Sequence, residues 1–263
     1  MPVRVDLDAG IAHVRLDRPE KRNGLDLEMF RSLIAAGQQV AADRSVRAVV
    51  LSGEGPVFCA GLDVQSVFMG GAQAVADLLD VRSGITNLAQ EAAWVWREVP
   101  APVIAAIHGA AYGGGLQIAM GADIRLIAPD ATMRVMEIVW GLIPDMGITK
   151  TALPQVRPDV LKELMLTGRK VAGPEAVALG LATRVCDDPK AAALALAAEI
   201  AAKNPHAVRR CKQLVDSAPG LSAADAFLLE TALQRPLLGS PNQMEAMTAR
   251  WQKRAPVFAD PED

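Results

Sequence analysis

Two short apolar strands, each followed by a glycine-containing turn, constrain the fold of this 263-residue chain most strongly. The first predicted strand covers residues 48–51 and leads to the turn Phe58-Cys59-Ala60-Gly61-Leu62-Asp63. The second covers residues 103–107 and leads to Gly113-Gly114-Gly115 at the start of a predicted helix. A strand–loop–helix pattern that occurs twice predicts an α/β fold with a largely parallel sheet.

Local signals predict further elements on both sides of these turns. Residues 3–7 and 11–16 alternate as in two strands, with Asp8-Ala9-Gly10 as the hairpin turn. Asp26 is expected to cap a helix, and a long helix is expected over residues 81–97. After Pro154 the pattern becomes helical, with predicted helices at 158–167, 174–179, 190–203, 205–216, 223–238 and 241–254. The last 60 residues are thus expected to be entirely helical.

Composition and charge exclude several classes of function. A net charge of −3 with scattered basic residues argues against a nucleic-acid surface, so a highly anionic ligand would be held locally. The cysteines, Cys59, Cys186 and Cys211, match no metal or redox spacing, and the three histidines are far apart, so no metal site is expected. Charges and glycines interrupt the longer apolar stretches, and residues 1–10 lack a signal-peptide core. A cytoplasmic protein with reduced thiols and no membrane segment is the expectation.

The two glycine turns suggest a way to stabilise negative charge. Glycine permits backbone conformations that leave amide N–H groups unpaired, and the start of a helix adds further free N–H groups. Two such N–H groups that converge on one oxygen would form an oxyanion hole. Each turn considered alone is more simply interpreted as an ordinary strand-to-helix connection.

Two carboxylates lie in the strongly apolar segment 134–147, namely Glu137 and Asp145. Apolar neighbours raise the pKa of a carboxyl group, which suits proton transfer near neutral pH. The alternative is that Glu137 pairs with a nearby arginine, or that each acid caps a turn.

Five motifs together resemble the enoyl-CoA hydratase/isomerase (crotonase) family, in order and over nearly the whole chain. They are Leu16-Asp17-Arg18-Pro19-Glu20-Lys21-Arg22-Asn23-Gly24-Leu25, then Cys59-Ala60-Gly61-Leu62-Asp63, the segment 109–117, the segment 136–147, and Arg254-Ala255-Pro256-Val257-Phe258. The resemblance implies a crotonase (ClpP-like) spiral of repeated ββα units with a helical C-terminal region. Residues 1–200 would form the core for acyl-CoA binding and catalysis, and residues 201–263 a helical oligomerisation region.

The resemblance also implies roles for individual residues. The backbone N–H groups of Leu62 and Gly114 would hold the thioester carbonyl. The strip Ala60, Gly61, Leu62, Asp63, Val64 and Gln65 would wrap coenzyme A, which enters as part of the substrate, with no other cofactor. Lys21 or Arg22 would contact its phosphates, and Lys253 would act from a neighbouring subunit. A homotrimer or a dimer of trimers is implied.

The acidic pattern departs from that of the family's hydratases, which use two glutamates around one water. The second corresponds to Glu137, but the first corresponds to Gln117, whose amide cannot act as a base. Gln117 could instead hydrogen-bond a water or orient Glu137. Glu137 and Asp145, eight residues apart, match two of the three acids of the dienoyl-CoA isomerase branch.

Three functions are compatible with these residues. The favoured one is isomerisation of a double bond in an enoyl- or dienoyl-CoA, with one acid or two. The others are hydration or another acyl-CoA reaction, and acyl-CoA binding without catalysis. Four residues are candidates for the wall of the acyl pocket: Met69, Trp94, Trp96 and Trp140. Ordinary packing on a helix face or in the core explains each of them at least as well.

Overall fold

The larger sheet grows from the hairpin at the N-terminus. In the computed structural model, which describes residues 1–81 and 84–261, β1 (Val3–Asp8) and β2 (Ile11–Leu16) pair antiparallel. Ala9 and Gly10 form the turn, both with positive φ. The sheet continues with parallel strands β3 (Ala48–Gly53), β4 (Val103–Ile107), β6 (Ile124–Ile127) and β9 (Arg184–Val185). The predicted α/β fold with a largely parallel sheet is confirmed.

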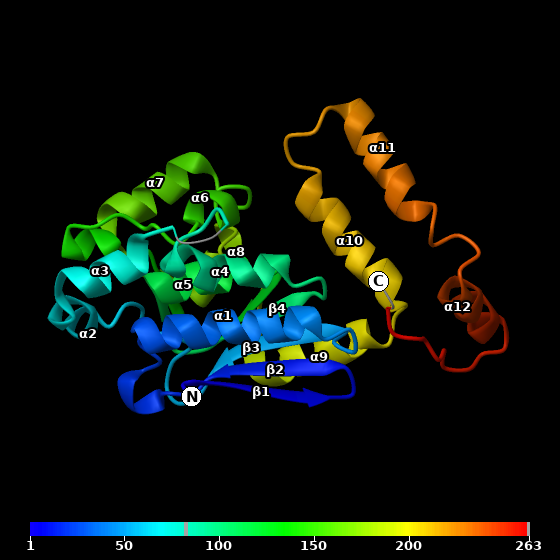
Figure 1. Ribbon diagram of the computed structural model, residues 1–263, viewed down its shortest axis with the longest axis horizontal. Coiled ribbons are helices and arrows are strands. Elements are labelled where there is room, and N and C mark those ends of the chain that lie inside the picture. Colours follow the sequence, from blue (N-terminus) through cyan, green and yellow to red (C-terminus); the bar gives the residue numbers. More distant parts are fainter. Residues whose placement is uncertain (82–83, 262–263) are drawn as a thin grey trace.

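Helices cover both faces of this sheet, which explains why residues 48–51 of β3 and all of β4 are apolar. Alternate residues of β3 and β4 face a large core under α1 (Leu27–Ala42) and α4 (Leu88–Glu98). The others face α9 (Pro189–Ala201), where Ala193 and Ala197 lie against Val50 and Ile104. Figure 1 shows α1 and α9 on opposite faces of the strands.

A second, smaller sheet runs beside the first, in the order β5 (Ala110–Tyr112), β7 (Thr132–Arg134) and β8 (Val171–Ala172). The elements β4, β5 and α5 (Gly114–Gly121) form one strand–strand–helix unit. The next unit runs from β6 and β7 into the 3₁₀ helix η2 (Glu137–Trp140) and α6 (Ile148–Thr151). The ββα repeat expected from the resemblance is therefore present.

Several helix boundaries follow from local capping. Asp26 caps α1 as predicted, because its carboxylate accepts the N–H of Met29. The helix expected over 81–97 begins instead at Leu88, because Asn87 and Gln90 form a capping box there; residues 82–83 of that prediction lie outside the described residues. The segment after residue 63 divides into α2 (Val64–Met69) and α3 (Gly71–Leu79).

The C-terminal part of the chain forms a helical arm. After α7 (Pro158–Thr167), α8 (Gly173–Ala178) and α9, the arm comprises α10 (Pro205–Ser217), α11 (Ala223–Gln234) and α12 (Pro241–Trp251). Figure 1 shows this arm standing away from the core, at the opposite end from α2 and α3. The chain then returns to the core, where Arg47 donates to the carbonyl of Phe258 and pairs with Asp260. In the described part of the chain, no helix has the length and apolarity needed to cross a bilayer.

Candidate active site

The two glycine turns lie side by side because their strands pair directly. Cys59 and Ala111 form a parallel bridge, and the N–H of Tyr112 donates to the carbonyl of Cys59 at 3.0 Å. Gly61 has φ +92°, and a β-carbon there would lie 2.6 Å from the carbonyl oxygen of Tyr112. Only glycine permits this conformation together with this close approach.

The two predicted oxyanion-hole amides occupy equivalent places on these paired segments. Leu62 and Gly114 each lie three residues beyond the bridge partners Cys59 and Ala111. Gly114 is the first residue of α5, so its N–H has no carbonyl within the helix to reach. Within the described residues, no backbone hydrogen bond uses either N–H group. The structure thus brings both amides to one edge of the site with their donors free.

The candidate base, Glu137, lies next to the second turn. A β-carbon on Gly113 would come within 3.3 Å of Glu137 Oε1. Gln117 Nε2 donates a hydrogen bond of 2.7 Å to the same oxygen, and Gln117 Oε1 accepts one of 2.8 Å from the N–H of Met146. The other carboxylate oxygen, Oε2, is buried and has no hydrogen-bond partner. Burial raises the pKa of Glu137, and the nearby charge of Asp145 raises it further. An acid of this kind is suited to exchanging protons near neutral pH.

Asp145 lies in the loop that leads from η2 to α6. Its neighbours Pro144 and Met146 are buried, whereas Asp145 itself is exposed. Although Asp145 reaches solvent, the protein around its carboxyl group displaces part of the surrounding water, and this desolvation raises its pKa as well. Asp145 is close enough for its charge to act on Glu137, so the structure places both predicted acids in one neighbourhood.

The predicted coenzyme A strip lies beside the basic loop that precedes α1. The N–H of Ala60 donates to the carbonyl of Arg22, and the N–H of Leu25 donates to Gly61. Lys21 is exposed and its Nζ lies 3.8 Å from a carboxylate oxygen of Asp63. Val64 and Gln65 continue the strip into α2. Lys21 and the strip therefore meet on one surface next to the glycine turns.

Asn23 holds this surface together, a role that sequence reasoning missed. Its fully buried side chain donates to the carbonyls of Glu54, Val57 and Phe58 and accepts the N–H of Arg18. Its φ of +54° is unusual for a residue other than glycine. The position of Asn23 inside the 16–25 motif was the available signal, but the three carbonyl partners lie 31, 34 and 35 residues away along the chain.

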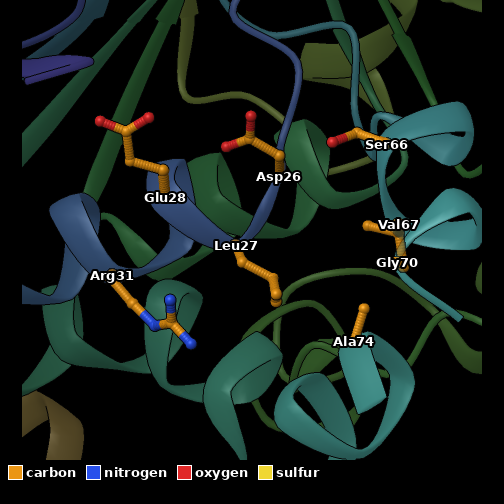
Figure 2. Close-up of a pocket in the computed structure, with 8 residues that line it drawn as sticks. All are labelled: Asp26, Leu27, Glu28, Arg31, Ser66, Val67, Gly70 and Ala74. Atoms are coloured by element: carbon orange, nitrogen blue, oxygen red, sulfur yellow. The ribbon is translucent and has the colours of Figure 1, made fainter. Parts of the chain in front are cut away.

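A hollow of about 320 Å³ opens between the start of α1 and the α2–α3 elbow. Figure 2 shows its lining side chains, which come from α1 and its capping residue on one side and from α2 and α3 on the other. The eight lining residues are Asp26, Leu27, Glu28, Arg31, Ser66, Val67, Gly70 and Ala74. Glu137, Gln117 and Asp145 do not line it, but Ser66 follows the predicted coenzyme A strip directly.

The other predicted residues lie in different environments, and Trp140 belongs to the same 3₁₀ helix as Glu137. Trp96 is fully buried in the core and donates to the carbonyl of Ala92, so it packs the interior instead of lining an open pocket. Met69 and Trp140 are exposed, and Trp94 donates to Glu98 on its own helix. Lys253 follows α12 on the arm, which Figure 1 places at the far end of the molecule from α2. Among the described residues, no group of three or more His, Cys, Asp or Glu side chains forms a metal-binding cluster.

Comparison with known families gives one family match over most of the chain. A sequence profile described as enoyl-CoA hydratase/isomerase matches residues 6–261. Solved structures agree with it: a putative enoyl-CoA hydratase/isomerase from Mycobacterium abscessus superposes with a TM-score of 0.90 at 28% identity, covering 98% of this chain and all of the other. A putative enoyl-CoA hydratase from Streptomyces coelicolor A3(2) superposes with a TM-score of 0.89 at 29% identity, covering 98% of this chain and 94% of the other.

Curated relatives carry the names of two different reactions. The human mitochondrial Delta(3,5)-Delta(2,4)-dienoyl-CoA isomerase is 39% identical over 212 residues, which is 77% of this chain. The match spans 64% of that relative's own length. A probable mitochondrial enoyl-CoA hydratase 2 from Arabidopsis thaliana is 31% identical over 255 residues, 95% of this chain and 82% of the relative.

Proposed function

This chain belongs to the enoyl-CoA hydratase/isomerase family and has the crotonase fold, and within that family we propose that it moves a carbon–carbon double bond in an enoyl- or dienoyl-CoA thioester. The single observation that carries the proposal is the environment of the Glu137 carboxylate. One of its oxygens is buried without a partner, the carboxylate lies next to the turn that carries the free Gly114 N–H, and the neighbouring side chain is an amide, Gln117, instead of a second acid.

The proposed chemistry begins with removal of a proton from the acyl chain. Glu137 Oε2 accepts a proton from the carbon next to the thioester carbonyl, and the electron pair of the broken C–H bond moves onto the carbonyl oxygen. The N–H groups of Leu62 and Gly114 stabilise that oxygen as the negative charge develops. Return of a proton to a different carbon completes the shift, so the reaction consumes no water and needs no redox partner.

Two versions of the second step differ in the proton donor. With an enoyl-CoA, Glu137 returns the same proton two carbons along the chain. With a 3,5-dienoyl-CoA, Asp145 delivers a proton at the far end of the conjugated system. The raised pKa of Asp145 supports the second version, because desolvation makes its carboxylate a stronger base than an ordinary aspartate and so better able to carry a proton. The similarity to the human dienoyl-CoA isomerase supports it as well.

Coenzyme A is proposed to bind as part of the substrate. The strip from Ala60 to Gln65 would contact the adenine and pantetheine, with Lys21 or Arg22 near the phosphates. Lys21 now pairs at 3.8 Å with Asp63, an exposed and weak contact that a phosphate would replace. Lys253 is proposed to reach a neighbouring subunit's site, since α12 lies far from the site of its own chain.

An ultraviolet assay tests the proposal. Purified protein with a 3,5-dienoyl-CoA is expected to form the conjugated 2,4-dienoyl product. Glu137→Gln is expected to abolish turnover while thioester binding persists, and Asp145→Asn to abolish turnover of the dienoyl substrate alone. Asp187→Asn, which changes an exposed acid after β9, is the matched control and is expected to match the wild type.

Other outcomes would select a different function. Rapid hydration of crotonyl-CoA with no double-bond shift would replace isomerase by hydratase, as the name of the Arabidopsis relative suggests. Binding of acyl-CoA without turnover of any thioester in a broad panel would favour a non-catalytic binder.

A further inference from the structure

The buried side chain of Gln117 has only one orientation that satisfies its surroundings. The side chain is 1% exposed and bridges Met146 and Glu137. A backbone N–H can only donate, so the amide oxygen of Gln117 must face Met146. Its NH₂ group must then face Glu137 Oε1. The orientation therefore follows from the network and not from an arbitrary choice between the amide nitrogen and oxygen.

This orientation makes the two oxygens of Glu137 unequal. Oε1 accepts the Gln117 hydrogen bond, and a proton on Oε1 would face an N–H group that cannot accept it. Oε2 has no hydrogen-bond partner. We propose that Gln117 is a positioning residue that restricts proton transfer to Oε2 of Glu137. The inference rests on the proposed function, because it assigns the atom through which that reaction would pass.

The same contact occupies the direct line between the Gln117 amide and the Glu137 carboxylate. The Gln117 nitrogen and Glu137 Oε1 lie 2.7 Å apart, which is a direct hydrogen bond. A water that bridges these two atoms would have to break it. The arrangement thus favours a single proton carrier over addition of water between two groups.

Gln117 also links the base to the oxyanion turn through Met146. The Met146 N–H is held by Gln117 at 2.8 Å. The buried side chain of Met146 packs against Gly114, where a β-carbon would lie 2.8 Å from its Sδ. One amide therefore ties together Glu137, the loop that carries Asp145 and the turn that carries the Gly114 N–H. Loss of Gln117 should affect the chemical step more than binding of coenzyme A, because the hydrogen bonds of its side chain go to Glu137 and Met146 and not to the predicted coenzyme A strip.

The test compares Gln117→Met with Gln117→Glu. Methionine keeps the length and apolar volume of the side chain but removes both hydrogen bonds. Because the bond from Gln117 lowers the pKa of Glu137, its loss is expected to raise that pKa. The acidic limb of the pH profile then moves to higher pH, and kcat falls about 10- to 100-fold with little change in KM. Gln213→Met, an exposed change on α10, is the matched control.

Gln117→Glu supplies a conditional rescue. A protonated glutamic acid can donate to Glu137 Oε1 while its other oxygen accepts the Met146 N–H. Rescue is therefore expected only at low pH, because at higher pH two carboxylates would face each other and titrate as a coupled pair. Rescue at all pH values would overturn the proposal.

Two readouts separate this inference from the proposed function. The first is a carbon-13 NMR titration of the Glu137 carboxyl group, assigned with Glu137→Gln. An unchanged Glu137 pKa in correctly folded Gln117→Met would overturn the inference, whatever substrate the enzyme uses.

The second readout is exchange of α-protons of butanoyl-CoA with D₂O, which needs a base and an oxyanion hole but no double bond. Slower exchange in Gln117→Met supports the inference, and wild-type exchange without isomerisation of any dienoyl- or enoyl-CoA would contradict only the proposed function.

Discussion

Gly114 illustrates how closely single residues are fitted around the site. A β-carbon there would lie 2.7 Å from Leu25 Cδ1 and 2.8 Å from Met146 Sδ, so Gly114→Ala must displace side chains. We expect activity to fall about 10²-fold or more because the free N–H moves, and stability to fall by about 1–3 kcal/mol. Steady-state kinetics and urea unfolding measure the two effects. Gly239→Ala has open space at positive φ, so it should lose about 1 kcal/mol without loss of activity.

His13, on β2, contributes a pH dependence to stability away from the site. Its ring lies 2.8 Å from Ser52 Oγ, and burial together with the charges of Lys190 and Arg15 lowers its pKa to about 4. The unfolded chain binds a proton near the ordinary pKa of 6.5, whereas the folded chain does not. The stability that comes from keeping His13 neutral in the folded chain is therefore fully present above pH 6.5 and is lost as the pH falls toward 4.

The prediction is that wild-type protein loses more stability than His13→Gln between pH 7.5 and pH 5. The expected difference is about 1 kcal/mol, allowing for partial exposure of the ring. Urea unfolding at the two pH values measures it. Equal losses in both proteins would show that His13 does not titrate with a lowered pKa.

At the scale of elements, polar contacts dock α10 onto the core. Pro205 is the one residue of this helix that is buried, so apolar packing contributes little. Lys212 instead reaches into the core, where its Nζ donates to Asp123 at 2.8 Å and to the carbonyl of Trp96. Arg97 and Asp216 form a second ion pair between the core and α10.

Lys212→Met should release the arm more than it destabilises the sheet. The Lys212 side chain is 7% exposed, and its removal leaves Asp123 without its cation, at an expected cost of about 3 kcal/mol. Amide hydrogen exchange should accelerate in α10–α12 while β3 and β4 stay protected. Lys203→Met removes an exposed pair with Glu199 and should cost less than about 0.5 kcal/mol. Uniform acceleration across the chain would contradict the docking role.

At the scale of the whole molecule, the arm presents apolar side chains that its own chain leaves exposed. Phe227 and Leu228 on α11 are 65% and 67% exposed, and Trp251 on α12 is 71% exposed. Exposed apolar surface of this kind is typical of association sites. The homotrimer or dimer of trimers predicted from the family resemblance would bury it.

Analytical ultracentrifugation tests this prediction. The native mass should be three or six times 27.8 kDa, and the double substitution Phe227→Ser and Leu228→Ser should shift it toward the monomer. Leu166→Ser changes an equally exposed leucine on α7 and should leave the mass unchanged. A wild-type monomer at micromolar concentration would refute the predicted assembly.

The sequence by itself determined what depends on near neighbours in the chain. The hairpin turn at Ala9 and Gly10, the Asp26 cap and the helix over 158–167 follow from turn chemistry, capping and periodicity, and all three are present. The family motifs also located the two amide-bearing turns and the two acids.

The tertiary structure decided what depends on distant partners. Strands as short as β5 and β7 carry little local signal, because pairing between segments stabilises them and not their own composition. Gln117 meets residues 20 and 29 positions away in the sequence. A sequence pattern shows that an amide stands where the family has an acid, but only the folded chain fixes which atom each of its groups faces. The orientation of Gln117, and with it the free oxygen of Glu137, is therefore a property of the tertiary structure.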